Sequence, residues 1–94
     1  MSQSRQLKIG TELKLGKYVS LGDEPPEMNI PLIIGNSPII RSHTIIYRGT
    51  TIGDNFQTGH GVLIRENNII GNKVSIGSHS VMFKLCQYVP LTVQ

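Results

Sequence analysis

The chain has little of what several protein classes require. Its 94 residues include no tryptophan and a single cysteine, Cys86. One cysteine cannot form a disulfide within the chain, so an intrachain disulfide framework is excluded. No apolar run approaches the roughly 20 residues that a membrane span needs. The first residues, MSQSRQLKIG, are polar and lack the apolar segment of a secretory signal. We therefore expect a cytoplasmic protein that does not contact a membrane.

Charged side chains are also scarce and scattered. They make up 16% of the residues, the formal net charge is +3, and no cluster or stripe of Lys and Arg is present. Nucleic-acid binding normally shows such a basic footprint, so we do not expect it here. The weak positive balance suits a small ligand that carries phosphate. The length allows one domain, and a chain this short buries only a modest share of its surface.

From Ile34 to Met82, a large aliphatic residue occupies almost every sixth position. The series is Ile34, Ile40, Ile46, Ile52, Thr58, Ile64, Ile70, Ile76, Met82, and glycine directly follows at Gly35, Gly53, Gly59, Gly71 and Gly77. A period of six fits neither an α-helix nor a lone strand, but it is the hexapeptide repeat of a parallel β-helix. Each hexad should form one side of a prism, with the aliphatic side chain inside. The following glycine is expected to supply a positive φ at the corner.

The same hexad occurs earlier in the chain, in a different phase. Ile9, Leu15 and Leu21 are each followed by glycine and predict one further coil. Residues 23–33 contain three prolines, which favour a loop that leaves the coil. After Met82 the hexad stops. We therefore predict one β-helix domain over residues 7–82, with an excursion at 23–33, and an irregular tail over 83–94.

Three hexads should close one triangular turn, so that every third hexad stacks on the first at about 4.8 Å. This register predicts three inner columns: Ile34/Ile52/Ile70, Ile40/Thr58/Ile76 and Ile46/Ile64/Met82. A second inward position lies two residues before each member of these columns. It includes Phe56, which must fill a local gap, and Asn68, which needs a polar partner.

The run from Ile34 to Met82, including IGDNFQTGHGVLIRE, resembles the left-handed parallel β-helix acyltransferases. Within that superfamily it is most similar to acetyltransferases of nucleotide-linked amino sugars. The resemblance implies an all-β, left-handed parallel β-helix of about four coils, assembled as a homotrimer. It also implies that acetyl-CoA, as cosubstrate, and a sugar acceptor bind between neighbouring prisms. Family members are typically longer, with several further coils, so we expect this chain to be a C-terminally truncated form.

The stacking register also places the histidines. His60 should lie between Ser42 and Ser78, whereas His43 and His79 share the neighbouring column. Acyl transfer to an amine needs a base that removes a proton as the nitrogen attacks the thioester, and a neutral imidazole suits that task. Relatives often use one histidine in this way. His60, whose flanking glycines leave its ring accessible, is the first candidate base, His79 the second and His43 the third.

Other polar side chains are candidates for substrate binding. Arg65 is expected to stack on Tyr47 and is a candidate ligand for a phosphate. Asn55 and Gln57 flank Phe56 near the His60 corner and are candidate sugar ligands. Two further columns are predicted to be structural, a solvated charged face and a ladder of short polar side chains: Arg48/Glu66/Lys84 and Asn36/Asp54/Asn72.

A metal site is not expected. A carbonic-anhydrase branch of the same fold binds zinc through three histidines, which must converge near 2.1 Å from the ion. His43, His60 and His79 span three coils and cannot converge within one subunit, although ligation shared across a trimer interface stays open. Cys86, in the tail, has no neighbouring base to activate it as a nucleophile.

The resemblance implies an acetyl-CoA-dependent acyltransferase that transfers acetyl to the oxygen or nitrogen of a sugar, and a nucleotide-linked amino sugar is the acceptor we expect. The alternative is a non-catalytic β-helix fragment that serves oligomerisation. Binding of acetyl-CoA separates the two hypotheses, because only the first one requires it.

Overall fold

The computed structural model describes residues 7–23, 29–82, 87–88 and 92–93. Within these residues the chain forms short strands and no helix, and therefore no helix that could cross a membrane. The strands are β1 (Leu7–Ile9), β2 (Lys14–Leu15), β3 (Ser20–Leu21), β4 (Leu32–Ile34), β5 (Ile39–Ile40), β6 (Ile45–Ile46), β7 (Thr51–Ile52), β8 (Gln57–Thr58), β9 (Leu63–Ile64), β10 (Ile69–Ile70), β11 (Ser75–Ile76), β12 (Val81–Met82), β13 (Gln87–Tyr88) and β14 (Thr92–Val93).

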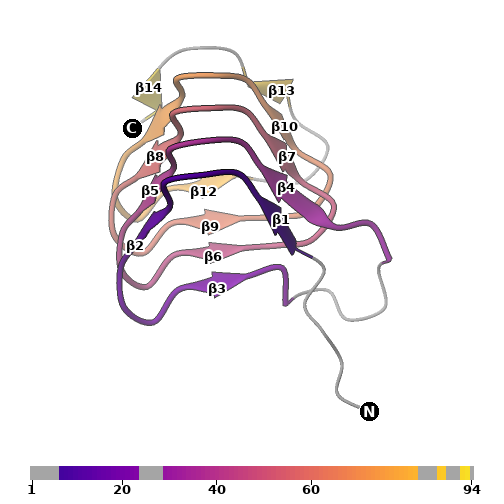
Figure 1. Ribbon diagram of the computed structural model, residues 1–94. Helices are drawn as coiled ribbons and strands as arrows, with labels where there is room; N and C mark the ends of the chain where they lie inside the picture. Colours follow the sequence, from indigo (N-terminus) through magenta and orange to yellow (C-terminus); the bar gives the residue numbers. More distant parts are fainter. Residues whose placement is uncertain (1–6, 24–28, 83–86, 89–91, 94) are drawn as a thin grey trace.

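These strands build three parallel sheets that form the sides of a prism (Figure 1). Sheet A has the order β1-β4-β7-β10-β13, sheet B the order β14-β11-β8-β5-β2, and sheet C the order β12-β9-β6-β3. Every third strand along the chain returns to the same sheet, so each coil contributes one strand to each side. The fold is an all-β parallel β-helix, and this prediction from the hexad is confirmed.

The predicted register holds in the regular coils. Ile52 pairs with Ile34 on one side and with Ile70 on the other, so each step up the prism covers the predicted three hexads. The ladder continues into the corners, where the Gly35 N–H donates to the carbonyl of Ile52 at 2.9 Å. A parallel ladder needs this constant step, because each coil supplies hydrogen-bonding groups only to the coils directly above and below.

The first coil is offset differently. Ile9 pairs with Ile34, which is a wider separation along the chain than that between Ile34 and Ile52. The additional residues lie where the proline-rich loop was predicted, but the loop is shorter than expected. Strand β4 already begins at Leu32, which pairs with Leu7 and is fully buried. Leu32 and Ile34 both face inward because alternate residues of a strand point to the same side.

The prediction of an irregular tail is corrected in part. Strand β13 pairs with β10, with Tyr88 opposite Ile70, which continues the regular register by one more coil. Strand β14 pairs with β11, with Val93 opposite Ile76, and here the step is one residue shorter. The hexad pattern does not reveal these strands, because Tyr88 replaces the aliphatic residue and no glycine follows it. Of the tail, only these two strands fall within the described residues.

The interior of the prism is filled as the two inward positions predict. All hexad residues from Ile34 to Ile76 are at most 2% exposed, Thr58 included. Phe56 is the largest of the fully buried side chains, and Asn68 is fully buried as well. The Asn68 amide donates to the carbonyl of Arg65 at 2.7 Å, which supplies the polar partner that a buried amide requires.

The corners from Ile34 onward turn at a different residue from the one that the sequence predicted. Positive φ occurs three residues after each hexad position, not at the glycine that follows it directly: Ser37, His43, Gly49, Asn55, Gly61, Asn67, Lys73, His79. Two of these eight are glycine and two are asparagine, residues that tolerate the left-handed region well. The other four adopt it because the ladders on both sides of the corner fix the backbone.

The glycines after the hexad positions have another cause, which is lack of space. A Cβ on Gly53 would overlap Oδ1 of Asn72 and lie 2.9 Å from the carbonyl carbon of Gly71. That Oδ1 is held there because it accepts the backbone N–H of Asp54 at 2.7 Å. Asp54 repeats the contact one coil away, where its Oδ1 accepts the N–H of Asn36 at 2.7 Å. The predicted polar column is therefore structural, and it requires glycine beside it.

We expect Gly53→Ala to destabilise the protein by about 1–3 kcal/mol, the usual cost of forcing an extra methyl group into packed structure. The φ of Gly53 is not positive, so the penalty comes from the overlap with the next coil. Urea unfolding monitored by circular dichroism measures it. Thr51→Ala, at an exposed position of strand β7 just before Gly53, should change the free energy of unfolding by no more than about 0.5 kcal/mol. Equal stability of both variants would show that the space at Gly53 is not limiting.

One predicted surface column is partly wrong. Arg48 is only 5% exposed, and its Nε donates to the carbonyl of Gly22 at 2.7 Å. The chain leaves the coil at Gly22, so this carbonyl needs a partner from elsewhere, and the guanidinium supplies one. Arg48 therefore fastens the start of the loop and does not belong to a solvated charged face. Lys84, the third member of that column, lies outside the described residues.

Candidate functional site

His60 lies at the corner between β8 and β9, with its side chain exposed. Its ring Nδ1 lies 2.8 Å from Oγ of Ser42, one coil below. Its backbone N–H donates to Oγ of Ser78 at 2.9 Å, one coil above. The structure thus brings together the three residues that the register placed in one column. The two serines have different tasks, since Ser42 contacts the ring and Ser78 contacts the backbone.

A cavity of about 310 Å³ opens beside this ring, and we call it the His60 groove. It is lined by Lys14, Leu15, Gly16, Ile39, Ile40, Arg41, Ser42 and His60. Its floor comes from β2 and β5 of sheet B, and its polar rim comes from the corner that follows β5. Two cations and one imidazole therefore face a common space with apolar side chains beneath them, which is the usual composition of a small-ligand site.

Arg41 is held in a defined position at this rim. Its NH1 donates to the carbonyl of Thr58 at 2.9 Å and lies 3.5 Å from Oε1 of Gln57. The guanidinium keeps further N–H donors beyond these contacts, and such a fork matches the oxygens of phosphate or carboxylate. Gln57, a predicted sugar ligand, does not line the His60 groove itself but contacts Arg41, which does.

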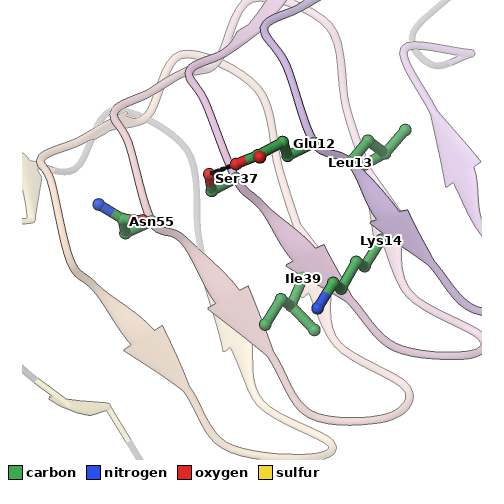
Figure 2. Close-up of a pocket in the computed structure, with 6 residues that line it drawn as sticks. All are labelled: Glu12, Leu13, Lys14, Ser37, Ile39 and Asn55. Carbon is green, nitrogen blue, oxygen red and sulfur yellow. Dashed lines mark hydrogen bonds between the residues drawn. The ribbon is translucent and has the colours of Figure 1, made fainter.

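A second cavity, of about 400 Å³, adjoins the first along sheet B, and we call it the Glu12 pocket (Figure 2). It is lined by Glu12, Leu13, Lys14, Ser37, Ile39 and Asn55. The two cavities share Lys14 and Ile39, and their lining residues come from three coils. The Ser37 hydroxyl donates to Oε1 of Glu12 at 2.9 Å, as the dashed line in Figure 2 marks.

The remaining candidate residues are distributed over other places. Asn55 lines the Glu12 pocket and not the His60 groove. Arg65 lies after β9, where its guanidinium carbon is 5.4 Å from the ring centre of Tyr47 and its Nε is 3.1 Å from Oε1 of Glu66. The predicted stacking on Tyr47 is confirmed, but Arg65 lines neither cavity. A phosphate bound in the His60 groove would meet Lys14 and Arg41 instead.

His79 lies in the column beside His60, with its ring over Gly61. A Cβ on Gly61, where φ is 67°, would be 2.9 Å from Nδ1 of His79, so a larger residue there would displace the exposed His79 ring. The backbone N–H of His79 donates to the carbonyl of His60 at 2.8 Å, but His79 lines neither cavity. Among the residues that the structure describes, no three His, Cys, Asp or Glu side chains lie close enough to hold a metal ion.

Sequence reasoning missed Lys14 and Arg41. Lys14 pairs with Ile39, and Ile39 pairs with Gln57, so all three project outward from neighbouring strands of sheet B. The wider offset between the first two coils hides this column from a search at the regular spacing of the later hexads. The signal was present in the earlier hexad, since Lys14 immediately precedes Leu15 as Ile39 precedes Ile40.

Comparisons of the chain with protein-family models, with curated proteins and with solved structures find no match. The structure itself defines a parallel β-helix with a histidine, a serine and two cations around one corner groove.

Proposed function

We propose that the protein is an acyltransferase that moves an acetyl group from acetyl-CoA to an amino sugar carried on a nucleotide. The observation that supports this most is the His60 imidazole, exposed in a groove that Lys14 and Arg41 also line, with its Nδ1 hydrogen-bonded to Ser42. Its other nitrogen, Nε2, has no hydrogen bond from any described residue. An anchored imidazole with one available nitrogen has the arrangement of a general base.

In this proposal, the reaction requires that the two substrates are held next to each other and that one group, the His60 imidazole, carries a proton between them. The His60 imidazole takes the proton from the acceptor nitrogen as that nitrogen attacks the thioester carbonyl carbon. The new bond to the acyl carbon forms, the bond from carbon to sulfur breaks, and the imidazolium returns the proton to the leaving thiolate. Lys14 and Arg41 bind phosphate oxygens of the substrates, and Gln57 and Asn55 offer hydrogen bonds to sugar hydroxyls.

Binding of acetyl-CoA is the direct test of the proposal. Isothermal titration calorimetry of the 94-residue chain should show saturable binding, weakened about tenfold in Arg41→Ala, because a hydrogen bond to a charged group contributes roughly 1.5–3 kcal/mol. Lys8→Ala, which removes an exposed cation outside both cavities, is the matched control and should bind as the parent does. No heat of binding at any concentration would favour the alternative, a non-catalytic oligomerisation fragment.

We also propose a homotrimer that uses the outer face of sheet C. The outward residues of β6, β9 and β12 are Ile45, Leu63 and Val81, an unbroken apolar stripe in which Ile45 is 40% and Val81 51% exposed. On sheet A the corresponding stripe is interrupted by Thr51, between Ile33 and Ile69. Exposed contiguous apolar surface of this kind is typical of an interface. Strand β9 directly follows the His60 corner, so the interface would lie beside the groove.

The proposed trimer interface is tested by placing a lysine on the outer face of sheet C and, as a control, on the outer face of sheet A. Ile45→Lys on sheet C should convert the trimer into monomers, because a lysine ammonium would be buried between subunits. Ile69→Lys, an isoleucine of similar exposure on sheet A, should leave the assembly intact. Sedimentation velocity at micromolar concentration distinguishes the species. A folded parent that sediments as a monomer would contradict the trimer, and dissociation by Ile69→Lys alone would move the interface to sheet A.

A further inference from the structure

The Ser42 hydroxyl lies between two imidazoles. Its Oγ is 2.8 Å from Nδ1 of His60 and 3.2 Å from Nδ1 of His43. His43 is itself steadied by Tyr18, with ring centres 5.2 Å apart, and its backbone N–H donates to the carbonyl of Lys17 at 3.0 Å. The three side chains come from two neighbouring corners of the same prism edge and form a chain in the order His43, Ser42, His60.

The number of available protons restricts the direction of the hydrogen bonds among His43, Ser42 and His60. A serine hydroxyl has one proton to donate, and a neutral imidazole carries one N–H, on either Nδ1 or Nε2. If neither Nδ1 carried a proton, the hydroxyl would serve only one ring, and the other Nδ1 would face an oxygen lone pair. For both contacts to be hydrogen bonds, at least one of the two rings has to carry its proton on Nδ1, where it donates to Oγ.

The charges at the groove select which ring this is. His60 lines the groove together with Lys14 and Arg41, whereas His43 does not line it. Positive charge in the groove favours the tautomer that directs a lone pair toward it and disfavours an N–H there. No acidic side chain lines this groove, so nothing among its lining residues opposes that preference.

We propose that His43 sets the tautomer of His60 through Ser42. His60 donates its Nδ1–H to Ser42 Oγ, the hydroxyl donates to Nδ1 of His43, and Nε2 of His60 keeps its lone pair. Ser42 and His43 are positioning residues, because neither has to touch the substrate. The consequence rests on the proposed function, since only a ring with a bare Nε2 can act as the base. The tautomer itself does not depend on any activity.

The tautomer is observable directly in the folded protein. Long-range ¹H–¹⁵N correlation spectra of ¹⁵N-labelled protein, recorded above the pH at which the rings are charged, should show His60 with a protonated Nδ1 and a bare Nε2. A wild-type spectrum in which His60 carries its proton on Nε2 overturns the proposal. This measurement needs no variant, so a substitution that fails to fold leaves the test intact.

Two pairs of matched variants then test the route. Ser42→Ala should return His60 to a mixture of tautomers, whereas Ser78→Ala should not, because Ser78 bonds only the backbone of His60. His43→Ala should shift the mixture in the same direction. His79→Ala should not, although both histidines are exposed and have φ near 60°. Unchanged spectra in Ser42→Ala and His43→Ala would contradict the relay.

Kinetics connect the relay with the proposed reaction. If the chain transfers acetyl, Ser42→Ala should lower kcat about fivefold with little change in KM, the equivalent of one ordinary hydrogen bond. Ser42→Thr, which keeps the hydroxyl, should recover most of the rate and the parent tautomer. A parent that shows the expected tautomer but no transfer would refute the proposed function and leave the relay standing. A parent that transfers acetyl while His60 carries its proton on Nε2 would refute the relay and the assignment of His60 as the base, and leave the acetyl transfer standing.

Discussion

If the chain transfers acetyl as proposed, His60→Ala is expected to lower the rate of transfer by roughly 10²–10⁴-fold, the usual contribution of a positioned general base. Binding of acetyl-CoA should change little, because in the proposed mechanism the imidazole acts on the acceptor nitrogen. His60 is exposed and its ring bonds only Ser42 among the described residues, so the truncation leaves no buried group without a partner. The assay measures transfer to a panel of nucleotide-linked amino sugars at saturating acetyl-CoA, with circular dichroism to show that the variant is folded.

Two other histidine variants make this result specific. His43→Ala should cost only about fivefold, because His43 acts through a single hydrogen bond to Ser42. His79→Ala should retain the parent rate if His60 is the base, since His79 lines neither cavity. Full activity in His60→Ala together with loss of activity in His79→Ala would assign the base to His79, the second candidate from the sequence.

The largest expected loss of stability comes from Phe56→Ala, at about 3–5 kcal/mol. Phe56 is fully buried and is the largest side chain in a narrow interior, and short strands of the coils above and below leave the prism little freedom to collapse around a void. A small domain has a total free energy of unfolding of roughly 5–15 kcal/mol, so this loss is a large fraction of it. Urea unfolding of parent and variant gives the difference.

Graded variants separate the cavity from loss of an aromatic ring as such. Phe56→Leu should recover a substantial part of the stability, because it refills much of the volume. Tyr18→Ala removes an aromatic ring that is 77% exposed and should cost no more than about 0.5 kcal/mol. If Phe56→Ala and Tyr18→Ala lowered the free energy of unfolding by the same small amount, this would show that the interior closes around the missing ring.

The fold could be predicted from the sequence because its rule is local and repeats. One buried aliphatic residue in six fixes the side length of the prism, and the stacking register follows from three such sides. The position of the positive-φ residue at each corner could not be predicted from this repeat. Ser37 and Lys73 show positive φ without any preference for it, because ladders on both sides of each corner impose the turn. Glycine at Gly53 marks a close approach between coils, which a single-chain pattern cannot distinguish from a turn.

The candidate site was predictable only where the spacing stayed regular. Ser42, His60 and Ser78 follow one another at the constant step of the coils, and the structure brings them together. Lys14 belongs to the coil before the loop, so its place beside His60 depends on a loop length that no periodicity encodes. Arg65 was associated with the site through its charge, but its stacking on Tyr47 holds it at another corner.

The constant step between coils also governs how this chain can vary in length. Deletion of residues 53–70 would join Ile52 to Gly71, and each remaining strand would find an equivalent neighbour in the same register. The architecture would survive such an event, but His60 would be gone and Ser42 would stack against Ser78. Insertions and deletions of whole coils therefore preserve the scaffold but change which side chains line the groove. Natural variation in the number of coils would remove or transplant a groove in one step, while point substitutions reshape it gradually.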